Sequence, residues 1–171
     1  MKVLGICGSL AQGSVNLRFL RSLETLLPSS VTFEVVTLHD IPMYSPDIAT
    51  QPDSVQTLCR KIKEADRVVI ATPEYNYSLP GVLKNALDWV SRSSELPFNG
   101  KKTAIMGASP GNVGTARCQY HLRQVGVFLN IQFINKPEVM IGQCRDKIDA
   151  EGKVTDEKTR DVLSQMVNAL L

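Results

Sequence analysis

The sequence has few of the features that mark metal sites, disulfide scaffolds, nucleic-acid binding or membrane insertion. Its four cysteines, Cys7, Cys59, Cys118 and Cys144, include no Cys-x-x-Cys pair, so no metal is expected and each is predicted to be a small buried core residue. The net charge of +2 is too small to favour nucleic acid as a partner. There is no run of about 18 apolar residues, which excludes a membrane-spanning helix.

The length of 171 residues predicts a single domain, residues 1–171, whose core needs neither metal nor disulfide. A hydrophobic content of 43% with 21% charged residues is typical of a soluble globular protein. The first residues, MKVLGICG, end at a glycine without a small-residue cleavage pattern. They therefore predict a buried strand rather than a signal peptide, and a cytoplasmic protein.

Short segments rich in Val and Ile alternate with segments of helical periodicity along the chain. The predicted strands are residues 2–7, 31–38, 67–72, 102–107 and 133–141. Apolar residues at helical spacing occupy the segments between and after them. Asp53 and Gln56 predict a capping box at the start of the second helix, and Pro80 fits the first turn of the third.

Five strands alternating with five helices predict a doubly wound α/β fold, in which helices cover both faces of a parallel sheet. Ligands of such folds bind beyond the carboxyl ends of the strands. The segments after the first, third and fourth strands are therefore the ones in which chemistry is expected. We refer to them as loop 1 (residues 8–16), loop 2 (residues 72–81) and loop 3 (residues 107–114).

Loop 1 reads GSLAQGSVN and joins a strand to a helix, where backbone N–H groups and the helix dipole favour an anion such as phosphate. Gly8 and Gly13 have the spacing of a Walker loop, but Ser14 and Val15 follow instead of Lys and Ser or Thr. The Gly-x-Gly-x-x-Gly fingerprint of dinucleotide sites is absent as well. The remaining donors are neutral hydroxyl and amide groups, which suit one terminal phosphate; capping of the helix explains them equally well.

Loop 2 reads TPEYNYSLPG and combines two prolines, two tyrosines and an amide. Proline restricts the backbone and lowers the entropy lost when a loop is held against a ring system. Loop 3 reads GASPGNVG, and its small side chains allow the backbone to approach a flat ligand. Two glycine-rich helix entrances beside an aromatic loop predict a phosphorylated three-ring cofactor, flavin mononucleotide (FMN).

These loops resemble those of the NADPH-dependent FMN reductase family, flavodoxin-like proteins that include quinone and chromate reductases. The resemblance covers nearly the whole chain. It is carried by Gly8-Ser9-Leu10 with Ser14 and Asn16, by Pro73-Glu74-Tyr75-Asn76-Tyr77-Ser78 with residues 79–81 and 83–89, and by Ser109-Pro110-Gly111 with Gly114. It implies a five-stranded sheet in the order 2-1-3-4-5 and a homodimer or homotetramer with flavin sites near the subunit interface.

The resemblance also assigns roles to individual residues. It implies that the FMN phosphate is held by Ser9, Ser14, Asn16 and Leu17, that the isoalloxazine is lined by Pro73, Glu74, Tyr75, Asn76 and Tyr77, and that Ser109 and Gly111 approach the ring. Two positions depart from the family pattern. Ala11 replaces an arginine, which removes a cation near the phosphate or the nicotinamide nucleotide. Thr115 replaces a glycine, and its β-carbon is expected to narrow the space over the flavin.

The predicted activity is hydride transfer from NADPH or NADH, through FMN, to a small oxidised acceptor such as a quinone, free flavin or metal oxyanion. The flavin N5 atom carries this chemistry, so no catalytic side chain is required. One alternative is a non-enzymatic electron carrier of the flavodoxin type, although such carriers are typically strongly acidic. Another is a nucleotide-sensing domain without a redox role, which would not bind FMN.

Four further side chains are open to interpretation. His39 and His121 lie outside the three loops and are expected to be structural or solvent-facing. The Glu74 carboxylate is either a charge near the site or exposed to solvent, and in the second case only the backbone of Glu74 contributes to the site. Trp89 is expected in the core or at a subunit interface rather than in contact with a cofactor, and the interface is favoured, given the oligomer that the resemblance implies.

Overall fold

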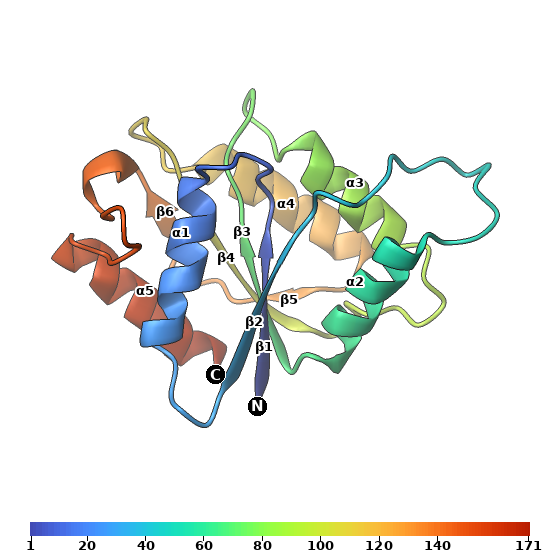
Figure 1. The fold of residues 1–171 in the computed structure, drawn as a ribbon, viewed down its shortest axis with the longest axis horizontal. Coiled ribbons are helices and arrows are strands. Elements are labelled where there is room, and N and C mark those ends of the chain that lie inside the picture. The colour runs from blue at the N-terminus through green and yellow to red at the C-terminus, as the bar shows by residue number, and fades with distance from the viewer.

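A computed structural model describes all 171 residues and shows one sheet of parallel strands between two helical layers (Figure 1). The strands are β1 (Lys2–Cys7), β2 (Thr32–Thr37), β3 (Arg67–Ala71), β4 (Lys102–Ala108), β5 (Gln132–Phe133) and β6 (Val139–Ile141). The order is β2-β1-β3-β4-β5, and β6 also pairs with β4. The predicted parallel order 2-1-3-4-5 is therefore confirmed.

The last predicted strand, residues 133–141, is wrong as one continuous element. β5 pairs only with the start of β4, at Lys102 and Thr103, whereas β6 pairs with the end of β4, at residues 106–108. Pro137 lies in the segment between them and has no N–H group for the ladder. The polar residues around this proline, within residues 135–138, mark the interruption in the sequence.

The helices lie on both faces of the sheet, as predicted. They are α1 (Val15–Ser22), α2 (Asp53–Glu64), α3 (Gly81–Val90), α4 (Ala116–Phe128) and α5 (Glu157–Leu170), with 3-10 turns η1 (Leu23–Thr25) and η2 (Cys144–Asp146). α1 and α5 pack on one face of the sheet, and α2, α3 and α4 pack on the other (Figure 1). Each helical layer forms a separate apolar core with the face of the sheet that it covers. No helix combines the length and the apolar character needed to cross a membrane.

The start of α2 differs from the predicted capping box. Pro52 occupies the N-cap position, and Asp53 lies in the first helical turn. The Gln56 side chain donates to the carbonyl of Gln51 instead of reaching back to Asp53. A proline at the cap offers neither a side-chain acceptor nor an N–H donor, so the reciprocal pair of hydrogen bonds cannot form.

Trp89 is a core residue of this chain, so its predicted place at an interface is wrong. Its side chain is 2% exposed, and its indole N–H donates to the carbonyl of Pro42 at 2.7 Å. The ring of Tyr44 packs edge-on against it, with 5.0 Å between the centroids. The segment after β2 therefore covers Trp89 from within the same chain.

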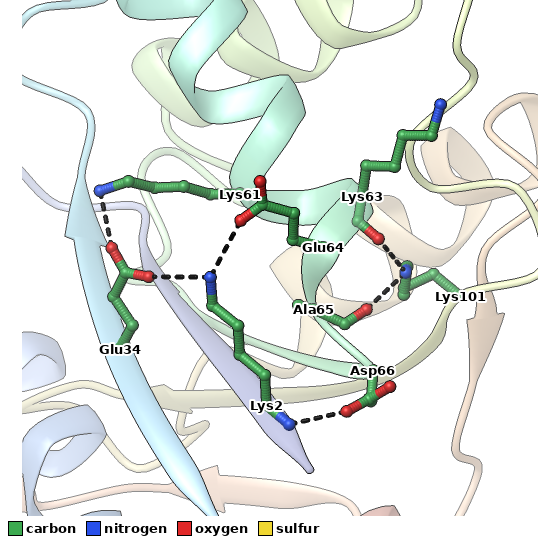
Figure 2. A network of polar contacts seen from close by, with 8 residues as sticks. All are labelled: Lys2, Glu34, Lys61, Lys63, Glu64, Ala65, Asp66 and Lys101. Carbon is green, nitrogen blue, oxygen red and sulfur yellow. Dashed lines mark hydrogen bonds and ion pairs between the residues drawn. The ribbon is translucent and has the colours of Figure 1, made fainter.

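A polar network closes the sheet at the end where β1 and β3 begin (Figure 2). The Lys2 ammonium lies 3.5 Å from Glu34 on β2 and 3.2 Å from Glu64 on α2, and Lys61 pairs with Glu34 at 2.7 Å. Lys101 donates to carbonyl groups at the end of α2, where a cation complements the helix dipole. The ion pair between neighbouring strands, Lys2 with Glu34, therefore lies at this end of the sheet, opposite the carboxyl edge.

Candidate functional site

The structure brings the three loops together at the carboxyl edge of the sheet, at the top of Figure 1. The Asn16 side chain exchanges two hydrogen bonds with the backbone of Ala108, of 2.8 and 3.0 Å, and so joins loop 1 to the end of β4. The Gly8 N–H donates to the carbonyl of Ala71 at the end of β3, and the Thr72 N–H donates to the carbonyl of Met106 on β4. The predicted site residues of all three loops therefore lie around one edge.

Loop 1 uses its polar side chains for structure while leaving donor protons available. Ser14 is the N-cap of α1, and its hydroxyl oxygen accepts from the Leu17 N–H at 3.2 Å. The Ser9 hydroxyl oxygen accepts from the Ala11 N–H at 3.3 Å. Both hydroxyl oxygens serve here as acceptors, and the Ser9 proton has no acceptor within the chain. The Ser14 hydroxyl also lies 4.0 Å from the Cys7 sulfur, a contact in which either group can donate, so its proton can go to the thiol or to an anion. Helix capping and anion binding are thus compatible uses of the same residues.

The first turn of α1 offers further donors. The first N–H groups of a helix have no partner within it, and among those of Val15, Asn16 and Leu17 only the Leu17 N–H is taken, by the Ser14 side chain. The N–H groups of Val15 and Asn16 therefore lie at a positive helix end that carries no acidic residue in its first turn. This helix end fits a phosphate held by neutral donors.

Loop 2 forms a tight two-residue hairpin. Tyr75 and Ser78 exchange two backbone hydrogen bonds of 3.0 Å, and Asn76 and Tyr77 between them have φ values of +50° and +69°. Positive φ at both central residues is the geometry of a type I′ turn. This turn directs Tyr75 and Tyr77 outward, with 50% and 70% of each side chain exposed.

Glu74 differs from the expectation of an exposed carboxylate. Its side chain is 11% exposed, and one carboxylate oxygen pairs with Arg117 at 3.0 Å. The other oxygen accepts from the Cys118 N–H at 3.1 Å. The acidic group of loop 2 is therefore engaged with the start of α4.

Loop 3 is held by the segment that follows β6. The Ser109 N–H donates to the carbonyl of Ile141, and the Ser109 carbonyl accepts from the N–H of Cys144. The Gly111 carbonyl accepts from the N–H of Gln143. The Ser109 hydroxyl donates to Gly111 at 3.2 Å. The split of the last strand therefore has a consequence for the site, because β6 fixes the backbone of loop 3 beside β4.

The expected effect of Thr115 on the space over a ligand is wrong. The residue is 1% exposed, and its side chain packs against Gly107, where an added β-carbon would collide with it. The Thr115 φ of +73° is a conformation that glycine adopts more readily. The threonine thus fills the interior beneath loop 3 instead of narrowing its outer surface.

Exposed apolar side chains surround this edge of the sheet. Leu10 of loop 1 is 41% exposed and Val113 of loop 3 is 42% exposed, in addition to the two tyrosines of loop 2. Exposed apolar groups from three separate loops indicate a ligand with an apolar face. Together with the unpaired N–H groups of α1, they fit a molecule that is anionic at one end and flat at the other, as FMN is.

The titratable groups near the loops do not supply a nucleophile. Burial raises the pKa of the Cys118 thiol to about 11, and burial also raises the pKa of the Cys7 thiol. Both thiols are therefore protonated at neutral pH and behave as core residues. All four cysteines are buried and free, which confirms their predicted structural role.

Both histidines lie beside loops that the sequence did not connect with them. The His39 ring nitrogen Nε2 is 3.1 Å from the carbonyl of Leu10, and His121 Nδ1 is 2.8 Å from the Ser78 hydroxyl. Sequence reasoning missed the contacts of His121 and Arg117 with loop 2. Their spacing of four residues, on one face of α4, was the available signal.

A cavity of about 650 Å³ lies elsewhere. It is lined by the segment after β2, by residues of α2 and by the end of α3 with the residues that follow it, among them Tyr44, Arg60 and Arg92. None of the predicted site residues lines it. The loop edge is the better candidate because it combines strand ends, a helix N-terminus and exposed aromatic groups at one place.

Comparison with known proteins assigns this arrangement to a family. The family described as NADPH-dependent FMN reductase matches residues 1–146. An NAD(P)H-dependent FMN reductase of Pseudomonas aeruginosa is 48% identical, over 99% of this chain and 93% of that protein. A quinone reductase of Escherichia coli strain K12 is 44% identical over 99% of this chain and 93% of its own length. The structure of FerB, a flavoenzyme NAD(P)H:(acceptor) oxidoreductase of Paracoccus denitrificans, superposes with a TM-score of 0.89 at 36% identity, covering 98% of this chain and 93% of FerB.

Proposed function

The chain belongs to the NADPH-dependent FMN reductase family, and on that premise we propose that it transfers hydride from NADPH or NADH, through FMN, to a small oxidised acceptor. Quinones, free flavin and metal oxyanions are the acceptor classes that we expect. The observation that carries this proposal is the convergence of loops 1, 2 and 3 at one sheet edge, with donors for a phosphate beside exposed aromatic side chains.

In this proposal the phosphate of FMN is held at the start of α1. The hydroxyl groups of Ser9 and Ser14 and the N–H groups of the first helical turn donate to it. The Asn16 amide is already bonded to Ala108, so we assign it the role of orienting the helix start toward loop 3. Leu17 contributes through the cap, because its N–H fixes the Ser14 hydroxyl.

Loops 2 and 3 are proposed to form the two sides of the ring site. The backbone of Pro73, Glu74, Tyr75, Asn76 and Tyr77 lies along one side, and Ser109 and Gly111 lie on the other. FMN, when bound, supplies the hydride chemistry at its N5 atom. The chain's own residues then bind the cofactor, orient it and exclude water, so no side chain is required as an acid or a base.

The activity is tested by adding FMN to the purified protein and recording its absorption spectrum without oxygen, before and after NADPH or NADH. Bleaching of the flavin by one nucleotide, followed by recovery on addition of a quinone, is expected. Bleaching without turnover in a steady-state assay with quinone would favour an electron carrier. A protein that takes up no FMN would contradict the proposal.

A homo-oligomer is part of the proposal. On and beside α4, the side chains of Val127, Phe128 and Leu96 are 78%, 76% and 58% exposed. Such an apolar patch is typical of a subunit interface. We expect a dimer or tetramer in light scattering, and Phe128→Glu is expected to give a monomer. A wild-type protein that is monomeric at micromolar concentration would contradict this part.

Residues 1–171 are proposed to act as one FMN-binding domain. A cytoplasmic location is proposed as well, because four buried free thiols fit a reducing compartment and NAD(P)H is a cytoplasmic reductant.

A further inference from the structure

α4 begins without a cap of its own. Thr115 precedes it in a left-handed conformation and makes no capping hydrogen bond with its side chain. The Thr115 hydroxyl accepts instead from the Gln119 side chain at 3.1 Å, and the first turn of the helix carries no acidic residue. The Ala116 N–H donates to the Val113 carbonyl of loop 3 at 3.4 Å, so it is the next N–H groups, those of Arg117 and Cys118, that depend on an acceptor from elsewhere in the chain.

Glu74 of loop 2 supplies that acceptor. Its carboxylate accepts from the Cys118 N–H at 3.1 Å and pairs with Arg117 at 3.0 Å, and the side chain is 11% exposed. A negative group at the positive end of a helix is electrostatically favourable. Because both oxygens are engaged within the chain, only the backbone of Glu74 is left to face a ligand.

The same helix face holds the rest of loop 2. The Arg117 guanidinium carbon lies 4.0 Å from the ring centroid of Tyr77, a residue with a φ of +69°. One turn further along α4, His121 is hydrogen-bonded to the Ser78 hydroxyl at 2.8 Å. Loop 2 is thus attached to α4 at three positions, through Glu74, Tyr77 and Ser78.

We propose that Glu74 is a positioning residue whose carboxylate joins loop 2 to the start of α4. Since α4 begins where loop 3 ends, this contact fixes the spacing between the two loops. The inference rests on the proposed function, in which the flavin ring lies between loops 2 and 3. Glu74 therefore affects cofactor affinity through loop geometry, without contacting the flavin through its carboxylate and without transferring a proton.

The test compares Glu74→Gln with Glu95→Gln in the full-length protein. Glu95 also makes an ion pair, with Lys63 at 2.9 Å, but this pair is more than half exposed and lies outside the three loops. Three quantities are measured: amide hydrogen exchange of residues 113–122 without FMN, the Kd for FMN by flavin fluorescence, and the pH profile of kcat at saturating FMN. Glutamine keeps the size of the side chain but presents only one acceptor oxygen.

For Glu74→Gln we expect faster exchange at the start of α4 and FMN binding weakened by about tenfold, the effect of losing one charge-assisted contact. The pH profile of kcat is expected to stay that of the wild type, and Glu95→Gln is expected to change none of the three. Unchanged exchange, unchanged affinity or a shifted pH profile would each overturn the inference.

The outcomes separate the inference from the proposed function. A wild-type protein that does not bind FMN contradicts the function, whereas the exchange measurement still reports whether Glu74 holds α4. Should Glu74→Gln fail to fold, Arg117→Met removes the more exposed partner of the same pair. It is expected to speed exchange in the same peptide and to weaken FMN binding by about two- to fivefold, and no change in either would overturn the inference.

Discussion

At the scale of single residues, the hydroxyl of Ser14 has two uses that its chemistry allows together. It accepts the Leu17 N–H as the N-cap of α1, and its own proton can be donated to the Cys7 sulfur, 4.0 Å away, or to an anion. The sequence left capping and phosphate binding as equal alternatives. The structure confirms the cap, and the phosphate contact remains a prediction that depends on the direction of one O–H bond.

Ser14→Ala separates the two uses. We expect the free energy of unfolding of the FMN-free protein to fall by about 1 kcal/mol, the usual effect of losing a cap, and FMN binding to weaken by tenfold or more. Urea unfolding and fluorescence titration measure these quantities. Thr25→Ala, which removes a hydroxyl in η1 away from the loops, serves as the control. Lower stability with unchanged affinity would leave Ser14 as a cap alone.

Ala11 is the residue at which nucleotide preference can be tested. It is exposed in loop 1, at the position where the family resemblance implies an arginine near the phosphate or the nicotinamide nucleotide. NADPH differs from NADH by one additional phosphate, so if Ala11→Arg places its cation beside the nucleotide, KM for NADPH is expected to fall about two- to fivefold relative to that for NADH at low salt. Steady-state assays at low and high ionic strength measure this change. Ala11→Gln, of similar length without charge, is expected to leave the ratio of the two KM values unchanged.

At the scale of elements, the apolar pattern predicted each helix whose apolar residues form a continuous stripe and each strand that is one continuous apolar segment. The pattern failed where an element was interrupted or capped by residues far away. β5 and β6 looked like one strand because residues 133–141 begin and end with apolar residues, yet each half pairs with a different end of β4. The start of α2 is set by Pro52, which displaced the predicted capping box.

The contact between β2 and α2 has a measurable pH dependence. The Lys61 ammonium, with Lys2, lowers the pKa of the Glu34 carboxyl from its ordinary value of 4.5. Because the folded pKa is depressed, the stabilisation is present above the unfolded value and is lost as the pH falls through the folded one. Lys61→Met is therefore expected to destabilise the protein at pH 7 by less than about 1 kcal/mol and to have no effect at a pH well below 4.

Urea unfolding at the two pH values measures this difference. Lys63→Met is the matched control, since the Lys63–Glu95 pair is more than half exposed and is expected to contribute less. An equal loss of stability at both pH values would show that Lys61 acts through packing of its side chain and not through the ion pair.

At the scale of the whole molecule, the candidate site exists because the sheet places the ends of its parallel strands at one edge. Three loops separated by dozens of residues become neighbours only because parallel strands end at the same edge. A ligand that contacts all three loops stabilises the folded chain, because it binds only when they are together.

FMN is therefore expected to raise the melting temperature. At a concentration 100 times its Kd the stabilisation is about 2.7 kcal/mol, which corresponds to roughly 5–10 °C for a domain of this size. Riboflavin, which has the same ring without the phosphate, is expected to give a smaller shift. Differential scanning fluorimetry measures both. Equal shifts for FMN and riboflavin would contradict a phosphate site at the start of α1.

The sequence by itself determined the layers of the fold, the strand–helix alternation and the three loops in which a ligand site is expected. These features follow from local patterns, because the spacing of apolar residues and the positions of turn residues depend only on neighbours in the chain. Tertiary structure alone decided that Asn16 bonds to Ala108, that Trp89 is covered by Pro42 and Tyr44, and that Glu74 caps α4. The hydrogen-bonded partners in these contacts lie 92, 47 and 44 residues apart, and no local spacing encodes such a distance. The partner of each of these polar groups is decided by tertiary structure for two reasons. The sheet brings the strand ends together, and a buried donor must find an acceptor among the groups that then surround it.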